Sequence, residues 1–348
     1  MSPTPRSTAE LQELLRAVRG PVRLLGTGSR QARLPAADGA TALSLAGLDR
    51  IRRLDAPDQT CSVEPGVRRE VLDAELARVG LELPCAGGGS LGGLFASDAT
   101  GPVTVGGASP RSLLLGLEAL LADGTSFRSG ARVVKSVAGF DVHKLLVGSQ
   151  GRLFAATQLH LRLRPRPRSE AWFERARLER DDALRLLATL RALAPAPAAL
   201  HLLRGPHGFS LAGRLAGRAV HVQATLREHA LREHALREGP ALASLHLEAT
   251  AGGEVVAGNV VGSRLPALLA AIPADARFLM HGGGRFEVAL ASARETDALL
   301  AALPALSTQA CIVLGEPARR GRGTPLDAGH ERLASGLKQT LDPHGIFV

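Results

Sequence analysis

The feature that most limits how this chain can fold is a glycine-dense segment near residue 90. Five of the seven residues from Gly87 to Gly93 are glycine, and further glycines follow up to Gly107. Glycine brings no side chain to a core and loses much backbone entropy on folding, so such a run destabilises an ordinary helix or strand. The segment therefore indicates a place where something flat or anionic approaches the backbone closely.

A second glycine-containing turn lies earlier in the chain. A predicted strand at 22–25 runs into the sequence GTGSR at 26–30, where backbone N–H groups can converge on a phosphate. The turn matches neither the P-loop pattern nor the dinucleotide pattern G-x-G-x-x-G, since residue 31 is Gln. Taken alone, an ordinary glycine turn explains it better than a phosphate site.

Capping boxes, turn residues and hydrophobic periodicity predict a succession of short helices and strands. The S-x-x-E pattern that starts helices occurs at Ser7 with Glu10 and at Ser292 with Glu295. Before residue 164 we expect a helix ending at Gly20, strands at 22–25, 41–45, 51–54, 60–63 and 153–163, a helix at 67–79, and a hairpin of 113–121 with 125–128. After residue 168 we expect strands at 171–178, 245–250 and 309–314 and near Leu200, Phe209, Val220, Phe278 and Phe286, with helices at 181–193, 226–238, 264–272, 292–303 and 326–341.

Chain length predicts two domains. At 348 residues the chain exceeds what a single hydrophobic core usually serves. The stretch 162–168, rich in Arg and Pro, is the best candidate for a boundary. A hydrophobic content of 45% argues against disorder, so we expect two folded domains with room for a cofactor between them.

The net charge of +9 does not by itself indicate a nucleic-acid partner. Arg is scattered along the chain, and an aromatic content of 3% without Tyr leaves few platforms for stacked bases, so we expect no nucleic-acid binding. No apolar run approaches the ~18 residues that cross a bilayer, and the first residues do not resemble a secretory signal. We therefore expect a cytoplasmic protein without membrane insertion.

The three cysteines predict neither a metal site nor a cluster in this chain. Cys61, Cys85 and Cys311 show no C-x-x-C spacing, so we expect reduced and buried thiols. Spacing alone supports no Ser/His/Asp triad, and no catalytic residue can be named.

The strongest motif runs from Arg132 to Gly151, with the sequence RVVKSVAGFDVHKLLVGSQG. It resembles the K-N-V-A-G-Y-D-[LV]-x-K-L-x-V-G-S-x-G signature of glycolate oxidase E subunits, flavoproteins of the vanillyl-alcohol-oxidase superfamily. Both glycine segments precede it in the family's order, and residues 342–346 are similar to a DPxGI-like tail. The resemblance implies an α+β fold: a PCMH-type two-part FAD-binding domain at 1–168, a smaller α+β cap domain at 169–320, and a C-terminal helix and tail at 321–348 that returns to the FAD domain.

The resemblance also implies a noncovalent FAD site. Residues 26–30 would cradle the pyrophosphate, residues 89–98 would line the flavin and diphosphate, and residues 148–156 would hold the adenosine end. The implied cofactor-binding residues are Gly26, Thr27, Gly28, Ser29, Arg30, Gly89, Ser90, Leu91, Gly92, Gly93, Ser97, Asp98, Gly148, Gly151, Arg152, Phe154 and Ala155. Lys135, Asp141 and Lys144 fit cofactor or interface contacts and a salt-bridged helix start equally well.

Several positions depart from the family pattern. Ser112 stands where an Asp is expected, Arg152 replaces a Thr, and Phe154 replaces a Gly, which could crowd the adenosine pocket. Related D-type subunits carry H-x-G-D-G-N-x-H, whose two histidines help to bind metal and substrate. In this chain the corresponding HGGGRF sequence keeps only His281.

The function that the resemblance implies is an FAD-binding subunit of a glycolate-oxidase-like 2-hydroxy-acid dehydrogenase. Its partners would be a D-type flavoprotein subunit and an iron-sulfur subunit, through which the chain could lie at the inner face of the membrane. Two alternatives stay open. One is a noncatalytic assembly subunit with a degenerate FAD site, which Ser112, Arg152 and Phe154 favour; the other is a stand-alone FAD oxidase of a different substrate.

Overall fold

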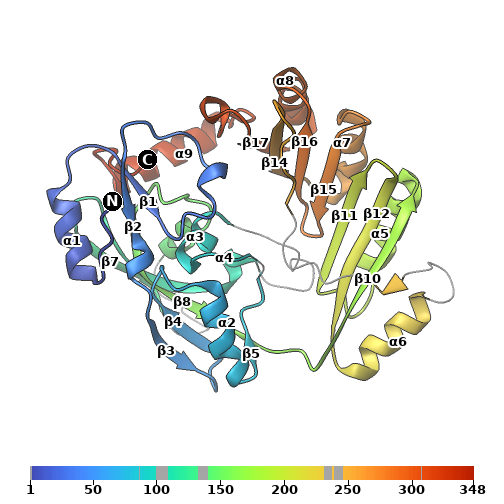
Figure 1. Ribbon diagram of the computed structural model, residues 1–348, viewed down its shortest axis with the longest axis horizontal. Helices are drawn as coiled ribbons and strands as arrows, with labels where there is room; N and C mark the ends of the chain where they lie inside the picture. The colour runs from blue at the N-terminus through green and yellow to red at the C-terminus, as the bar shows by residue number, and fades with distance from the viewer. Residues whose placement is uncertain are drawn as a thin grey trace.

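The structure is a computed structural model, which describes residues 2–85, 87–98, 109–131, 140–230, 237–238, 246–306 and 308–348. Figure 1 shows an N-terminal part in blue and cyan beside a large sheet in green, yellow and orange. Lys135 and the parts of the two motifs at residues 99–108 and 132–139 lie outside the described residues. Within the described residues, no helix combines the length and the apolar content that crossing a membrane requires.

A small parallel sheet begins the N-terminal part. Helix α1 (Thr8–Ala17) starts at Ser7, whose hydroxyl accepts from the N–H of Glu10 over 3.2 Å, so the first predicted capping box is confirmed. Strand β1 (Val22–Leu25) pairs with β2 (Thr41–Ser44), and the short helices η1 (Gln31–Arg33) and η2 (Leu45–Gly47) flank this pair.

A five-stranded antiparallel sheet forms the rest of the N-terminal part, in the order β3-β4-β8-β6-β7. Its strands are β3 (Ile51–Asp55), β4 (Thr60–Val63), β6 (Leu114–Leu120), β7 (Ser126–Gly130) and β8 (Ala155–Arg162). The connecting elements are α2 (Arg69–Arg78), β5 (Leu81–Glu82), α3 (Leu91–Ala96), α4 (Pro110–Leu113), η3 (Val142–Leu146) and β9 (Arg164–Pro165). Leucines of α2, α3 and β8 pack together in one core, which fixes the glycine-dense segment against the sheet.

An eight-stranded sheet follows, in the order β13-β10-β12-β11-β15-β16-β14-β17. Its strands are β10 (Ser169–Leu178), β11 (Ala199–Gly205), β12 (Gly208–Gly217), β13 (Arg237–Glu238), β14 (Glu254–Asn259), β15 (Arg277–His281), β16 (Arg285–Leu290) and β17 (Gln309–Leu314). Its helices are α5 (Arg180–Arg191), α6 (Ala219–Ala230), η4 (Gly262–Arg264), α7 (Leu265–Ala271), α8 (Ala293–Ala302), η5 (Leu303–Leu306) and η6 (Pro317–Arg319). Leucines of α5, α7 and α8 pack on one face of the sheet, and the second predicted capping box, Ser292 with Glu295, starts α8.

Three predictions in this second part were wrong. Residue Val220 lies in α6 and not in a strand, because Val222 turns inward to the core while Val220 is 79% exposed. The helix predicted at 226–238 does not reach its end, since residues 237–238 form β13. Residues 246–250 form no strand; the strand of this region is β14, at 254–259, which lies between β16 and β17.

The C-terminal segment returns to the first strand. After α9 (Ala328–Leu341), Phe347 pairs with Val22 in parallel, and the N–H of Val22 donates to the carbonyl of Ile346 over 2.6 Å. The ammonium of Lys338 donates to the carbonyls of Arg152 and Phe347, over 2.7 and 2.6 Å. The tail therefore holds together β1 and the segment that leads into β8.

Candidate functional site

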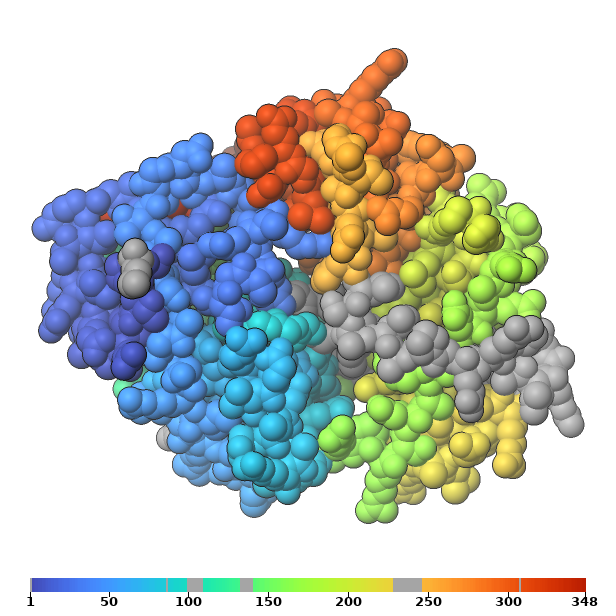
Figure 2. Space-filling model, in the orientation of Figure 1, coloured from blue at the N-terminus to red at the C-terminus, as the bar shows by residue number. Residues whose placement is uncertain are grey.

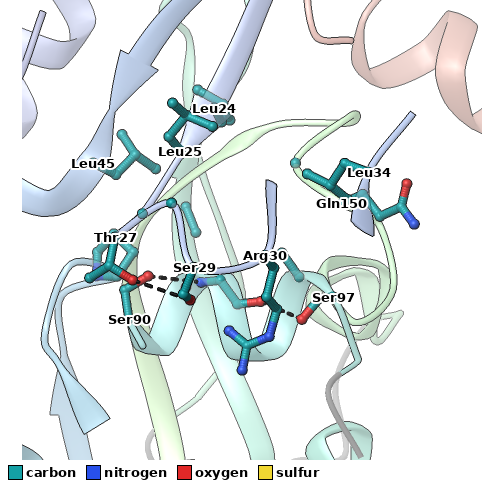
Figure 3. A pocket seen from close by; sticks show the side chains of 18 of the residues that line it. Leu24, Leu25, Thr27, Ser29, Arg30, Leu34, Leu45, Ser90, Ser97 and Gln150 are labelled. Atoms are coloured by element: carbon teal, nitrogen blue, oxygen red, sulfur yellow. Dashed lines mark hydrogen bonds between the residues drawn. The ribbon is translucent and has the colours of Figure 1, made fainter. Parts of the chain in front are cut away.

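A pocket opens where β1 ends, between the first glycine loop and α3 (Figure 3). The lining residues are Leu24, Leu25, Gly26, Thr27, Gly28, Ser29, Arg30, Gln31, Leu34, Leu45, Pro65, Ser90, Gly92, Gly93, Ala96, Ser97, Leu146, Gln150, Gly151, Phe154 and Ala156. Leucines and Phe154 form the apolar walls, while loop 26–30 supplies hydroxyls, backbone amides and one cation. Such a pocket suits an anionic group joined to a flat apolar one.

Loop 26–30 presents backbone donors to this pocket. Within the described part of the chain, the N–H groups of Gly28, Ser29 and Arg30 donate to no other group. The loop is nevertheless fixed, because its own carbonyls accept from the following turn: Gln31 N–H donates to Gly28 over 3.1 Å and Arg33 N–H to Arg30 over 3.0 Å. Successive unpaired N–H groups on a fixed turn form an anion-binding concavity.

The start of α3, in contrast, has few donors to offer. The N–H of Leu91 donates to Val67 over 2.9 Å and that of Gly92 to Pro65 over 2.7 Å. The N–H of Gly93 points to the hydroxyl of the helix-capping residue Ser90, over 3.4 Å. The glycine-dense segment is thus held against residues 65–67, and Gly92 is needed for that close approach.

Glycines also let the two segments touch each other. A Cβ on Gly26 would lie 1.9 Å from the Ser90 hydroxyl oxygen, and a Cβ on Gly89 would lie 2.6 Å from the Ser29 hydroxyl oxygen. Gly28 and Gly89 have φ of +75° and +84°, conformations that L side chains rarely adopt. The guanidinium of Arg30 bridges the segments by donating to the carbonyl of Gly88 over 2.8 Å.

Arg30 is a pocket cation without a carboxylate counterion among the described residues. Burial and then the nearby positive charge of Arg33 lower the pKa of Arg30. Both effects disfavour the charged guanidinium, and a bound anion would relieve them. The free N–H groups, the unmatched cation and the apolar walls therefore fit a dinucleotide cofactor with a diphosphate.

The structure brings most of the predicted cofactor residues into this one pocket. Those that line it are Gly26, Thr27, Gly28, Ser29, Arg30, Ser90, Gly92, Gly93, Ser97, Gly151 and Phe154. Those outside its lining are Gly89, Leu91, Asp98, Gly148, Arg152 and Ala155. Leu91 and Ala155 belong to the cores behind the pocket, and the Arg152 side chain is exposed.

Neither Phe154 nor Arg152 projects into the pocket in the way that would crowd a cofactor: Phe154 is buried and Arg152 is exposed. The Phe154 ring is 1% exposed and makes an edge contact with Phe127, with ring centroids 5.2 Å apart. It therefore builds the wall as a core residue. Ser112, at the end of α4, is exposed and lies outside the lining, with its hydroxyl donating to the carbonyl of Ser109 over 2.9 Å.

Other lining residues escaped sequence reasoning. Leu34, Leu45, Pro65 and Leu146 read as ordinary core or turn residues, and only the folded chain brings them together. Gln150 had a usable signal, since it lies between Gly148 and Gly151 in the signature, and it has a φ of +55°.

A second group of polar residues lies on the face of the eight-stranded sheet opposite its helix-side core. Along β16, Phe286 and Val288 face the helix-side core, so Arg285 and Glu287 point to the opposite face. The opposing charge of Arg285 acts on Asp98 at the end of α3: burial raises the pKa of Asp98, and Arg285 and Arg111 counteract that rise. This face of the sheet is therefore turned toward the pocket-bearing part of the chain.

A pair of buried histidines occupies the same face. The motif around His281 contains one histidine, but β11 supplies a second: His201 pairs with His281 across the strands, with their Nδ1 atoms 2.9 Å apart. Burial and then His281 lower the pKa of His201 to about 3, so His201 is neutral near pH 7. Residue His201 could not be predicted, because the register of β11 with β15 is a long-range property.

The three cysteines are free thiols, and the described residues contain no metal site. Burial raises the pKa of the Cys61 and Cys85 thiols, to about 12 and about 11. Cys61 and Cys85 are buried and Cys311 is partly buried, and none of the three forms a disulfide. In the described ranges, no cluster of three or more His, Cys, Asp or Glu residues has the geometry to hold a metal ion.

Comparison with known sequences supports a flavin site. Residues 3–130 match the family described as "FAD binding domain". The chain is 35% identical over 174 residues to the probable mitochondrial D-lactate dehydrogenase of Danio rerio, which covers 47% of this chain and 35% of that protein. It is 31% identical over 120 residues to glycolate oxidase subunit GlcE of Escherichia coli, covering 33% of this chain and 34% of the subunit. With subunit GlcD of Bacillus subtilis the identity is 27% over 211 residues, covering 58% and 45%.

These relatives share only part of their length with the chain, about a third to under a half. The solved structures extend the likeness to the whole fold. A structure of alkyldihydroxyacetonephosphate synthase covers 99% of this chain with a TM-score of 0.68 at 14% sequence identity, and the chain covers 75% of it. The chain therefore has the PCMH-type FAD-binding fold in an α+β architecture, and FAD is its cofactor.

Proposed function

We propose that this chain is the FAD-binding, E-type subunit of a glycolate-oxidase-like 2-hydroxy-acid dehydrogenase and holds FAD noncovalently. The observation that carries the proposal is the pocket, in which apolar residues lie beside Arg30 and beside loop N–H groups that have no partner among the described residues. The names of the relatives, D-lactate dehydrogenase and glycolate oxidase subunits, support 2-hydroxy acids as the substrate class. No Cys or His lines the pocket within the described residues, which supports noncovalent binding.

Loop 26–30 would hold the FAD diphosphate. Its N–H groups at Gly28, Ser29 and Arg30 are the available donors, and the Arg30 guanidinium supplies the matching charge. Gln150 and Gly151, between Leu24 and α3, would lie at the adenosine end. The donors of α3 contribute less, because they are already used within the protein.

Bound FAD supplies the chemistry by accepting a hydride from the substrate C–H. The half-buried Arg285, on the face of the eight-stranded sheet opposite its helix-side core, would orient the substrate by holding its carboxylate. Burial raises the pKa of Asp98, which weakens its competition for the same guanidinium. The His201–His281 pair on the same face, with its Nδ1 atoms 2.9 Å apart, supplies the second histidine that the HGGGRF motif alone did not provide.

The partners follow from electron balance. Electrons taken by the flavin need an acceptor, and the described cysteines are isolated thiols that cannot ligate a cluster together. We propose an iron-sulfur subunit as that acceptor and a D-type flavoprotein as the second flavin chain. Association with a membrane would then occur through these partners. Domain boundaries at 168 and 320, with the tail of 321–348 on the FAD domain, complete the assignment.

The assembly-subunit alternative loses much of its support. It was favoured by Arg152 and Phe154 as residues that would block FAD, yet the Arg152 side chain is exposed and Phe154 packs against Phe127. Ser112 is exposed outside the pocket lining. A stand-alone oxidase requires turnover without partners, which is directly measurable.

The experiment is absorption spectroscopy of the purified chain, before and after anaerobic addition of a 2-hydroxy acid that would reduce the bound flavin. We expect a yellow protein that releases FAD on denaturation. By itself it should not oxidise glycolate or D-lactate catalytically. Co-expression with the D-type and iron-sulfur chains should give turnover. A colourless protein that takes up no added FAD would refute the proposal, and robust turnover by the single chain would favour the stand-alone oxidase.

A further inference from the structure

A buried carboxylate on the large sheet reaches the turn that follows loop 26–30. Glu287 is 1% exposed, and its Oε1 accepts from Arg33 Nη1 over 2.8 Å. The Nδ1 of His246 lies 2.7 Å from the same oxygen, and the N–H of Leu247 donates to Oε2 over 2.8 Å. Arg33 also donates to the carbonyl of Leu247 over 3.0 Å. One carboxylate thus gathers three segments: η1, residues 246–247 and β16.

Arg33 is rigidly joined to the loop that would hold the diphosphate. Its N–H donates to the carbonyl of Arg30, and the neighbouring Gln31 N–H donates to Gly28. Gln31 and Leu34 line the pocket on either side of Arg33, whereas Arg33 itself turns to Glu287. A shift of Arg33 would therefore move the backbone that presents the free N–H groups.

The charge state of Glu287 suits a permanent link. Burial raises the pKa of Glu287, but hydrogen bonds from His246 and Arg33 outweigh it and lower the pKa to about 2. The carboxylate is ionised at neutral pH and has donors on both oxygens. A buried charge is tolerated when it is paired and hydrogen-bonded in this way, and removal of one partner is strongly unfavourable.

A second buried pair in the same sheet provides a reference. Glu254 is 3% exposed and accepts from Arg319 over 2.7 Å, but both residues belong to the second part of the chain. The Glu287 pair differs in joining that part to the N-terminal part, and η1 also packs against β17. In Figure 2, orange residues of the large sheet lie against blue N-terminal residues at the top of the view.

We propose that Arg33 and Glu287 are positioning residues that couple FAD binding at loop 26–30 to docking of residues 246–253 and the large sheet. This inference rests on the proposed role of loop 26–30 in holding the diphosphate. Because coupling between two events is reciprocal, bound FAD should hold residues 246–253 in place, and their docking should favour FAD. Neither residue contacts the cofactor pocket itself.

The test measures two quantities on the full chain: FAD affinity, by titration of the apoprotein, and amide hydrogen exchange of residues 246–253 with and without FAD. In the wild type, FAD should slow exchange there. Arg33→Met keeps an apolar stem but removes the guanidinium, and we expect about tenfold weaker FAD binding and loss of the FAD effect on exchange. Glu287→Gln should act in the same direction.

The matched control is Glu254→Gln, which removes a buried carboxylate that accepts from Arg319 and has no hydrogen bond to η1 among the described residues. We expect it to leave FAD affinity within about twofold of wild type. If folded Arg33→Met binds FAD as tightly as wild type and keeps the FAD effect on exchange, the coupling is refuted while the FAD proposal stands. The Arg33 side chain is 23% exposed and that of Glu287 1%, so Arg33→Met should fold more readily than Glu287→Gln. Arg33→Met therefore tests the coupling even if Glu287→Gln does not fold. Failure of the wild type to bind FAD would instead refute the proposed function.

Discussion

The two glycine-rich segments of the pocket resemble each other in sequence but use their backbones differently. Three successive N–H groups of loop 26–30 are unpaired within the described residues, whereas Leu91 and Gly92 already donate to Val67 and Pro65. Loop 26–30 is therefore equipped to bind an anion. The denser segment at 87–93 is equipped to pack closely against other backbone.

The difference teaches what a glycine run can and cannot indicate. Glycine marks close approach, but the approaching group may be a ligand or a neighbouring segment. At Gly92 it is Pro65, since a Cβ there would lie 2.7 Å from the Pro65 Cβ. At Gly28 only the Gln31 side chain comes within 4 Å of the Cβ position, so the space belongs to the pocket.

The largest expected effect concerns the wall behind both segments. Phe154→Ala should lower the free energy of unfolding by about 3–5 kcal/mol, because it empties a buried site beside Phe127. Denaturant unfolding of the apoprotein measures this change. Tighter FAD binding by the variant, with unchanged stability, would show instead that the ring crowds the cofactor.

Gly92→Val should have the next largest effect, and chiefly on stability. A side chain at 92 collides with Pro65, and overpacking of this kind costs about 1–3 kcal/mol. Gly92 has no positive φ, so the backbone conformation itself is not the obstacle. Thermal unfolding without FAD measures the loss. Normal stability with abolished FAD binding would contradict the packing role and assign Gly92 to the cofactor.

Gly28→Ala should act mainly on FAD affinity. The φ of +75° at Gly28 costs an alanine about 1–2 kcal/mol, and relief of that strain would rotate the N–H groups away from the pocket. We expect about tenfold weaker FAD binding in titrations. Gly39→Ala is the matched control, because Gly39 has a φ of +76° with no atom within 4 Å and lies outside the pocket. Equal losses of FAD affinity in both variants would show a general effect on folding.

Local signals account for the parts of the fold that were predicted correctly. Capping hydroxyls at Ser7 and Ser292 start α1 and α8, as the S-x-x-E pattern requires. The wrong assignments occur where tertiary contacts decide. Strand β14 follows Gly252 and Gly253, which read as a loop, but it is buried between β16 and β17. Residues 254–257 are buried on both faces of the sheet, which leaves no alternating pattern to detect.

The site was predictable only where function is local in sequence. Loop 26–30 follows directly on β1, so its residues could be named together. Arg33 and Glu287 are separated by 254 positions, and His201 meets His281 through strand register. A charged residue on a strand gives no sequence signal of the partner it will find. The sequence therefore predicted the loop that lines the pocket but not the contacts that join it to the large sheet.

The smallest expected effect distinguishes the two segments most directly. Ser90 caps α3, but its hydroxyl accepts from Gly93 over a long 3.4 Å, so Ser90→Ala should lower stability by only about 1 kcal/mol. Ser7→Ala removes the equivalent cap of α1, far from the pocket, and should cost a similar amount. If loop 26–30 alone holds the anion, both variants should bind FAD within about threefold of wild type, since no backbone donor of that loop changes. A much larger loss of FAD affinity in Ser90→Ala than in Ser7→Ala would mean that the start of α3 binds the cofactor after all. The contrast between the two glycine segments would then be wrong, whatever their stabilities.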